Sequence, residues 1–206
     1  MKQFIDSIRK SVKDENWLAA LFMALAMPDI CSSLEFPNRP RSRIGEYYGN
    51  WFNKFLKPKY ASDNAYDHLM ATDPEFLNGI EKLLPPEFNN MFVEQHRLAK
   101  IPSQTKFTAE DCYRFRCRCL HEGLAQRSKE GNGNPIIFTV PKHEKVGFHK
   151  SSINGVLQLQ IDTFCEDVCL AVLEWEKSVI NNNEIKDRME ELITTYILGD
   201  QILTIS

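Results

Sequence analysis

Three arginines and one histidine lie in a single short segment, at Arg114, Arg116, Arg118 and His121. Guanidinium groups stay charged and bind phosphate oxygens in a forked geometry. An imidazole can transfer a proton near neutral pH. Like charges this close on a helix repel each other by roughly a few tenths of a kcal/mol per pair, so a purely structural helix gains little from them. The segment therefore predicts a site for a phosphate-containing substrate.

The flanking residues predict that this segment is a helix. Thr108 and Asp111 resemble a capping box, which satisfies backbone groups at a helix N-terminus. Gly123 is a natural stop. We therefore expect a helix between these residues.

On a regular helix, the candidate residues do not all share one face. At about 100° per residue, Arg114 and Arg118 fall on the same face as His121, whereas Arg116 lies about 140° away from His121. A site that uses both Arg116 and His121 therefore needs a distorted helix end or a second copy of the helix. A twofold dimer would supply that second copy.

The sequence from Arg116 to His121, Arg-Cys-Arg-Cys-Leu-His, matches the R-x4-H signature of the HEPN superfamily. These are helical proteins that include many metal-independent ribonucleases. The longer stretch Glu110–Gly123 resembles a motif of bacterial and phage HEPN-like proteins of unassigned function. The segments Asn16–Leu21 and Gly155–Asp167 are also similar to those chains.

This resemblance implies a helical bundle that dimerises, so that two copies of the motif form one cleft. In the family, the pair promotes attack of an RNA 2′-hydroxyl on the adjacent phosphate, which leaves a 2′,3′-cyclic phosphate and a 5′-hydroxyl. Carried over, Arg116 would stabilise the developing phosphate charge, and His121 would transfer the proton. The expected partners are RNA, a second copy of the chain, and an antitoxin or inhibitor protein. No metal or cofactor is expected, and the family's common role is toxin-like or anti-phage.

Further cations are expected to help bind the substrate. Arg114 to His121 is an R-x6-H spacing, so either Arg114 or Arg116 can be the main arginine. Arg118 is expected as an auxiliary phosphate contact, as is Arg114 if Arg116 leads. A basic stretch of the β insertion is either a solvated hairpin or a rim that guides RNA, and it contains Lys142, His143, Lys145, His149 and Lys150. Of these, Lys142 and Lys145 are expected to bind the substrate.

One residue departs from the family pattern and keeps other functions open. Active members commonly carry Asn, Asp or His after the motif arginine, where this chain has Cys117. A thiol replaces the hydrogen bonds of an amide poorly. The main alternative is therefore a catalytically silent HEPN-like module that binds RNA or a protein. A third hypothesis is a helical adaptor, in which His121 stabilises the end of its helix.

Composition and charge exclude several classes of protein. The chain has 206 residues, 43% hydrophobic and 26% charged, as in an ordinary globular domain rather than a disordered or collagen-like chain. The net charge of −3 excludes a generic polycation. Residues 151–206 hold 3 basic and 10 acidic residues, a balance of −7, and residues 1–150 hold 22 and 18, a balance of +4. An anion-binding surface is therefore expected in the first three-quarters of the chain.

The cysteines and the apolar segments indicate a cytoplasmic protein. No secretory signal is recognisable at the N-terminus, so the six cysteines are expected to be reduced. Their spacing fits zinc poorly, and small buried thiols explain them. The longest apolar run, Trp17–Met27, has 11 residues, too few to span a bilayer.

Hydrophobic periodicity predicts one mainly α domain over residues 1–206, an HEPN-like helical bundle with a small β-hairpin insertion near 135–161 and acidic C-terminal helices over 162–206. Residues 17–27 are expected to form a buried central helix that Pro28 kinks or ends. Residues 57–73 are ambiguous. Other helices are expected over 4–12, 44–56, 74–84, 87–98, 109–122, 164–175 and 185–197. The strand 136–141 is expected to pair with 145–151, and 157–161 to add a third strand. Asp162 or Thr163 is expected to cap the helix that follows.

Overall fold

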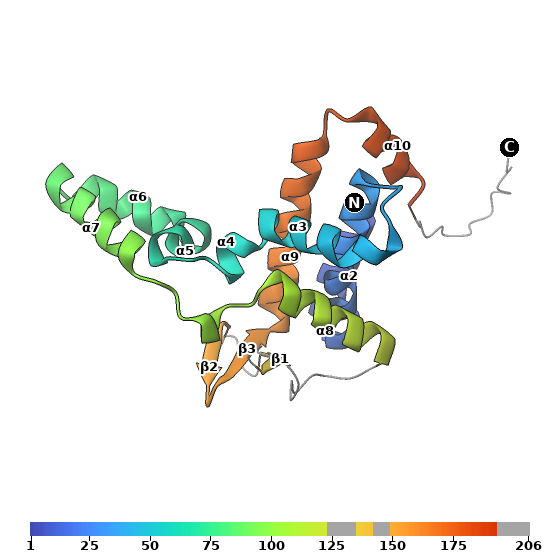
Figure 1. Ribbon diagram of the computed structural model, residues 1–206, viewed down its shortest axis with the longest axis horizontal. Coiled ribbons are helices and arrows are strands. Elements are labelled where there is room, and N and C mark those ends of the chain that lie inside the picture. The colour runs from blue at the N-terminus through green and yellow to red at the C-terminus, as the bar shows by residue number, and fades with distance from the viewer. Residues whose placement is uncertain (123–134, 142–148, 193–206) are drawn as a thin grey trace, which may run out of the picture.

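The computed structural model describes residues 1–122, 135–141 and 149–192, and these residues are mainly helical (Figure 1). Two single turns of 3₁₀-helix, Arg41–Arg43 and Ser103–Thr105, lie between the longer helices. The α-helices are α1 (Lys2–Lys13), α2 (Trp17–Glu35), α3 (Ile44–Phe55), α4 (Lys57–Tyr60), α5 (Ala65–Thr72), α6 (Pro74–Leu83), α7 (Pro86–Leu98), α8 (Ala109–Glu122), α9 (Ile161–Val179) and α10 (Asn183–Glu190).

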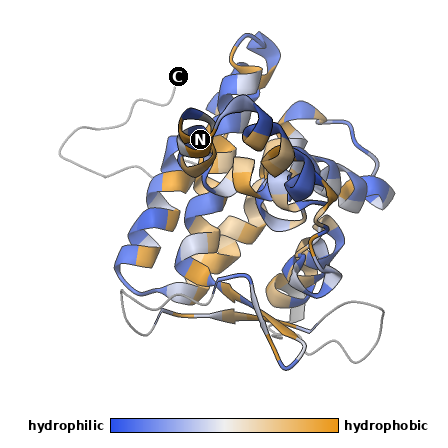
Figure 2. Ribbon diagram, turned by 90° about the vertical axis from the view of Figure 1, so that its left-hand side faces the viewer, coloured by the Kyte–Doolittle hydropathy of each residue, from blue (hydrophilic) through white to orange (hydrophobic). Residues whose placement is uncertain are grey.

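The nearly all-apolar helix α2 forms the centre of the core, as predicted. It packs against α1, α3, α8, α9 and α10. The aromatic stripe of α3 buries Tyr48, Trp51 and Phe52, and the apolar stripe of α9 buries Trp175. Apolar residues of neighbouring helices therefore gather in the interior (Figure 2).

Pro28 was predicted either to kink this helix or to end it, and the second alternative is wrong, because α2 continues to Glu35. Proline in a helix interior costs about 3 kcal/mol, since it removes one hydrogen bond and crowds the preceding turn. Met27 and Cys31, on both sides of Pro28, are fully buried in the core. Packing of both halves of α2 outweighs the local cost.

The apolar run Trp17–Met27 alone is too short to cross a bilayer, but the whole of helix α2 is long and apolar enough to do so by length and composition. No other helix in the described part of the chain is. Half of its most apolar stretch is buried inside the domain. Its position at the centre of the core is a sufficient reason for its composition.

Residues 57–73, which the sequence left ambiguous, form the short helices α4 and α5. These lead into α6 and α7, which extend away from the core (Figure 1). Helices α5, α6 and α7 pack mainly against one another. Of the apolar residues of α6, Leu77 is buried, whereas Phe76 and Leu83 are exposed.

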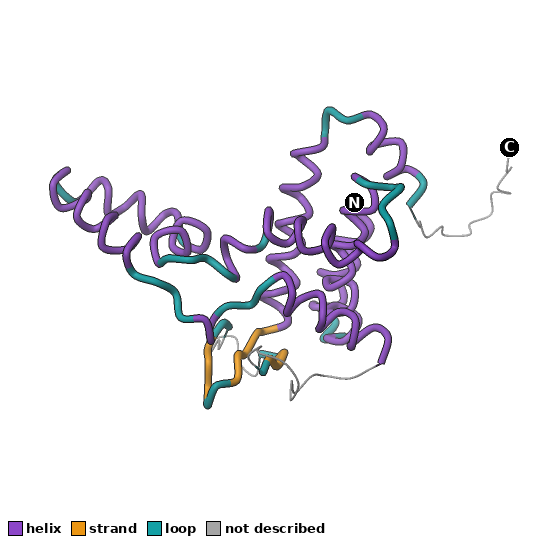
Figure 3. The backbone as a smooth tube through the Cα atoms, viewed as in Figure 1, coloured by secondary structure: helices purple, strands orange, loops and turns teal. Residues whose placement is uncertain are grey.

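The small β insertion is present, but its pairing differs from the prediction (Figure 3). Strands β1 (Ile136–Thr139), β2 (Ser151–Ile153) and β3 (Val156–Gln160) form one sheet in the order β1-β3-β2. β1 is parallel to β3, and β2 is antiparallel to β3. The predicted pairing of 136–141 with 145–151 is therefore wrong for the residues that the structure describes.

A two-residue turn determines this pairing. Asn154 and Gly155 join β2 to β3 and have φ values of 52° and 76°. An Asn-Gly pair favours this left-handed turn, which matches the twist of a hairpin. β3 then runs directly into α9, whose N-cap is Gln160 without a side-chain cap bond, so the predicted cap at Asp162 or Thr163 is also wrong.

Candidate functional site

Helix α8, which carries the arginines, begins at the predicted capping box. The Thr108 backbone N–H donates to Asp111 Oδ2 at 3.0 Å, and the Asp111 N–H donates to Thr108 Oγ1 at 3.2 Å. Cys112 and Phe115 are buried against the core. The cap and these two side chains fix where the helix starts and which face points inward.

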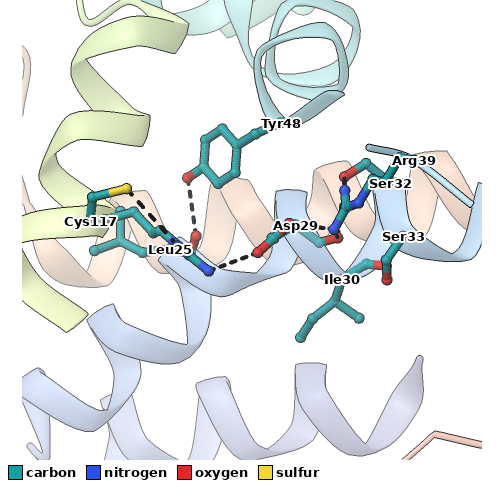
Figure 4. A network of polar contacts seen from close by, with 9 residues as sticks. Leu25, Asp29, Ile30, Ser32, Ser33, Arg39, Tyr48 and Cys117 are labelled. Atoms are coloured by element: carbon teal, nitrogen blue, oxygen red, sulfur yellow. Dashed lines mark hydrogen bonds and ion pairs between the residues drawn. The ribbon is translucent and has the colours of Figure 1, made fainter. Parts of the chain in front are cut away.

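Arg116 lies towards α2 and contacts Asp29. Its Nη2 donates to Asp29 Oδ2 at 2.7 Å, and the two side chains are 17% and 18% exposed. The other oxygen, Asp29 Oδ1, accepts from Arg39 Nη2 at 2.5 Å (Figure 4). Arg39 Nη1 also donates to Ser32 Oγ at 2.5 Å. One carboxylate therefore orients two guanidinium groups, and the three charges sum to +2 − 1 = +1.

The residues beside Arg116 connect α8 to α2 and α3. Tyr48 Oη donates to the Leu25 carbonyl at 3.0 Å and lies 3.1 Å from Cys112 Sγ. Burial raises the pKa of Tyr48 well above its usual value. A Cβ on Gly45 would come within 2.9 Å of the Tyr113 ring, so α3 and α8 need a glycine at this contact. These contacts keep the helix that carries Arg116 close to Asp29.

Arg114 contacts a different carboxylate from Arg116. Arg114 is 44% exposed and pairs with Glu110, one turn earlier on α8. Arg118 is half-buried. The structure thus places Arg114 on the outer surface of α8 and Arg116 on the side that contacts α2.

The remaining predicted residues lie outside the part of the molecule that can be described in atomic detail. The backbone of α8 includes position 121, but the His121 side chain is not described. Lys142 and Lys145 also lie outside the described residues. The pairing of Arg116 with His121 and the basic rim therefore stay predictions.

Sequence reasoning missed two residues of this cluster, Asp29 and Arg39. A signal for Asp29 was available, because it is the one ionisable acid among the apolar residues 17–34. A carboxylate within a buried helix needs a cationic partner. Nothing in the local sequence identifies that partner, since Arg39 and Arg116 meet Asp29 only in the folded chain.

The prediction that the cysteines are buried is confirmed for most of them. Five of the six cysteines are buried, and Cys117 is half-buried beside Arg116. Burial raises the pKa of Cys112 to about 12, so this thiol stays protonated at neutral pH. Among the side chains that the structure describes, which leave out those of His121 and Glu122, no group of three or more His, Cys, Asp or Glu is placed to hold a metal ion.

The arrangement can bind an anion through an oriented arginine whose carboxylate partner is shared. A guanidinium held in this way does not need to reorganise when a phosphate arrives.

No protein-family model, curated protein or solved structure matches the chain.

Proposed function

We propose that this protein is a metal-independent endoribonuclease of HEPN type, which acts as a homodimer through helix α8. The observation that carries the proposal is the contact of Asp29 with Arg116. It holds the motif arginine in one orientation, and Arg39 is a second cation on the same carboxylate. Preorganised cations of this kind stabilise the charge that develops on a phosphate during cleavage.

In this proposal, each residue has one role. Arg116 stabilises the negative charge as the RNA 2′-hydroxyl attacks the adjacent phosphate. His121 moves the proton. Because positions 116 and 121 lie about 140° apart on a helix, the histidine comes from the second copy of α8. Arg114, on the outer surface, binds a neighbouring phosphate, and Arg118 assists it.

A second candidate is a silent module that binds RNA or a protein through the same surface. The ion pair between Asp29 and Arg116 also supports this alternative, because the carboxylate neutralises part of the charge that a phosphate would meet. Cys117, half-buried next to Arg116, supplies weaker hydrogen bonds than the amide or imidazole usual in active members.

RNA cleavage in the presence of EDTA distinguishes the two candidates. We expect the wild type to cleave and to leave 2′,3′-cyclic phosphate ends, and we expect His121→Ala and Arg116→Ala to lose at least about 99% of this activity. Arg97→Ala is the matched control. Arg97 belongs to the projecting helix α7, where its guanidinium lies over the ring of Tyr66 from α5. Binding without cleavage by folded wild type would favour the silent module. Equal cleavage by wild type and His121→Ala would exclude the mechanism.

A further inference from the structure

A polar cluster distinct from α8 lies where α4, α5, α9 and the turn before β2 meet. Its centre is the half-buried amine of Lys150. Lys150 Nζ donates to the Lys59 carbonyl oxygen and lies 3.4 Å from His68 Nδ1. The amine also lies 5.9 Å from the centre of the Tyr60 ring. Residues distant in the sequence therefore surround one amine on three sides.

The backbone holds this amine in place. Lys150 has a φ of 57°, in the left-handed region that residues with a Cβ rarely adopt. A strained backbone conformation of this kind persists only where the contacts around it hold it in place, and such conformations cluster at functional sites. The neighbouring His149 Nδ1 accepts from the Gln160 backbone N–H at 3.1 Å, which anchors the turn to β3.

The nearby carboxylate is already engaged. Asp167 Oδ1 accepts from Lys59 Nζ at 2.5 Å, and Asp167 Oδ2 accepts from Tyr60 Oη at 2.8 Å. Lys150 is thus partly removed from water and donates to a neutral carbonyl rather than to that carboxylate. Burial lowers the pKa of Lys150 to about 8, against an opposing effect of Asp167. A pKa of about 8 leaves roughly a tenth of this amine uncharged, and hence nucleophilic, at pH 7.

His68 is positioned to take a proton from the amine. Its Nδ1 lies within hydrogen-bond distance of the amine, at 3.4 Å. A lysine ammonium only donates, so Nδ1 presents a lone pair to it. Burial and the charge of Lys150 lower the pKa of His68, which keeps the ring neutral.

We propose that Lys150 is a reactive amine that forms an imine with a small uncharged aldehyde, with His68 as the proton acceptor. The Lys150 Nζ lone pair attacks the carbonyl carbon, and the carbonyl π electrons move to oxygen. His68 Nδ1 takes one amine proton and returns it to this oxygen. The resulting hydroxyl leaves as water with the second amine proton, and a C=N bond remains. A neutral aldehyde is the matching substrate class, because the charges of Lys59 and Asp167 beside the amine already pair with each other.

Competitive labelling of the intact wild-type chain tests the proposal. The probe is propanal with cyanoborohydride, which reduces the imine to a stable propyl-lysine, and mass spectrometry measures each lysine separately. At pH 7.5 we expect Lys150 to react at least about tenfold faster than Lys10, which is 76% exposed, because a pKa of about 8 leaves part of the Lys150 amine uncharged. Labelling of Lys150 at or below the rate of Lys10 would overturn the proposal.

A histidine variant separates proton transfer from a structural role. His68→Gln is expected to slow Lys150 labelling about tenfold, while the midpoint of its pH profile stays near 8. The groups that face Lys150 are Lys59 and Tyr60 from α4, His68 from α5, Asp167 from α9, and His149. If the histidine only supports the fold, the amine becomes exposed and the midpoint rises towards 10.5, which would refute its role as proton acceptor. His96→Gln, on α7, is the matched control.

Discussion

At the scale of the single residue, Asp29 organises the candidate site. It is an acid in an otherwise apolar stretch of helix, and each of its oxygens accepts from a different arginine. Burying a charge is costly unless it is paired and hydrogen-bonded. The pairing of Asp29 with Arg39 and Arg116 is therefore a condition for keeping α2 at the centre of the core.

Asp29→Asn is expected to reduce the free energy of unfolding by about 1–3 kcal/mol. The change removes the carboxylate charge that two partly buried guanidinium groups share. Urea unfolding monitored by circular dichroism measures the loss. Asp14→Asn is the control, because it breaks an exposed pair with Lys10 that contributes at most about 1 kcal/mol. Equal losses of unfolding free energy in the two variants would show that the Asp29 cluster contributes no more to stability than an exposed ion pair.

His149 predicts a pH dependence of stability. Burial lowers the pKa of His149 to about 4 from 6.5. Between these values the unfolded chain binds more protons than the folded chain, so this residue destabilises the fold as the pH falls from about 6.5 to 4. We expect the loss of stability between pH 7 and 4.5 to be about 2 kcal/mol smaller in His149→Gln than in wild type. An identical pH dependence of the two proteins would contradict this prediction.

At the scale of the element, the sequence predicted the helices and caps whose formation depends on side chains that are close together along the chain. The apolar α2, the aromatic stripe of α3 and the capping box of α8 all follow from side-chain spacing. Two other features depend on tertiary packing. Pro28 lies inside a helix because both halves of α2 pack in the core, and β1 pairs with a strand about 20 residues further along the chain. The Asn154-Gly155 turn was readable as a hairpin signal and would have corrected the predicted pairing.

The candidate site divides in the same way. The sequence identified Arg114, Arg116 and Arg118 from their chemistry, since charge patterns are local. It could not show that Arg116 faces α2, because that depends on which face of α8 the buried Cys112 and Phe115 turn inward. The sequence marked Lys150 only as part of a basic stretch, because its contacts with His68 and Tyr60 form only in the folded chain.

The contact between α3 and α8 gives a prediction about two helical glycines. Gly45→Ala is expected to destabilise the protein by about 1 kcal/mol, because the new methyl group would lie 2.9 Å from the rigid Tyr113 ring. Gly79→Ala, in α6, is the matched control, since nothing lies within 4 Å of its added Cβ. Alanine should stabilise that helix by up to about 1 kcal/mol. Thermal unfolding measures both, and changes of the same sign would contradict the predicted contact.

At the scale of the whole molecule, the proposed function requires two copies of α8. The proposal that Arg116 and His121 come from different copies makes a sharp prediction for mixed dimers. Arg116→Ala and His121→Ala proteins are each expected to be inactive. After subunit exchange in equal amounts, half of the dimers would be mixed, each with one intact site, and about a quarter of wild-type activity should return.

Two outcomes would contradict the shared cleft. No recovery after exchange, verified by light scattering on differently sized tagged copies, would place both residues in one copy or in no site at all. A wild-type monomer at micromolar concentration would exclude the dimer directly. A mixture of His121→Ala with Arg97→Ala is the positive control. The Arg97→Ala chains still carry both Arg116 and His121, so the activity of this mixture sets the scale of the assay.

The shared carboxylate of Asp29 also has an evolutionary consequence. If Arg116 serves only to balance the charge of Asp29, related chains should gain or lose the acid at 29 and the arginines at 39 and 116 together. If Arg116 also acts on a substrate, selection should retain it together with His121, even in lineages where position 39 drifts. Covariation among these positions would then record which of the two demands has shaped the protein.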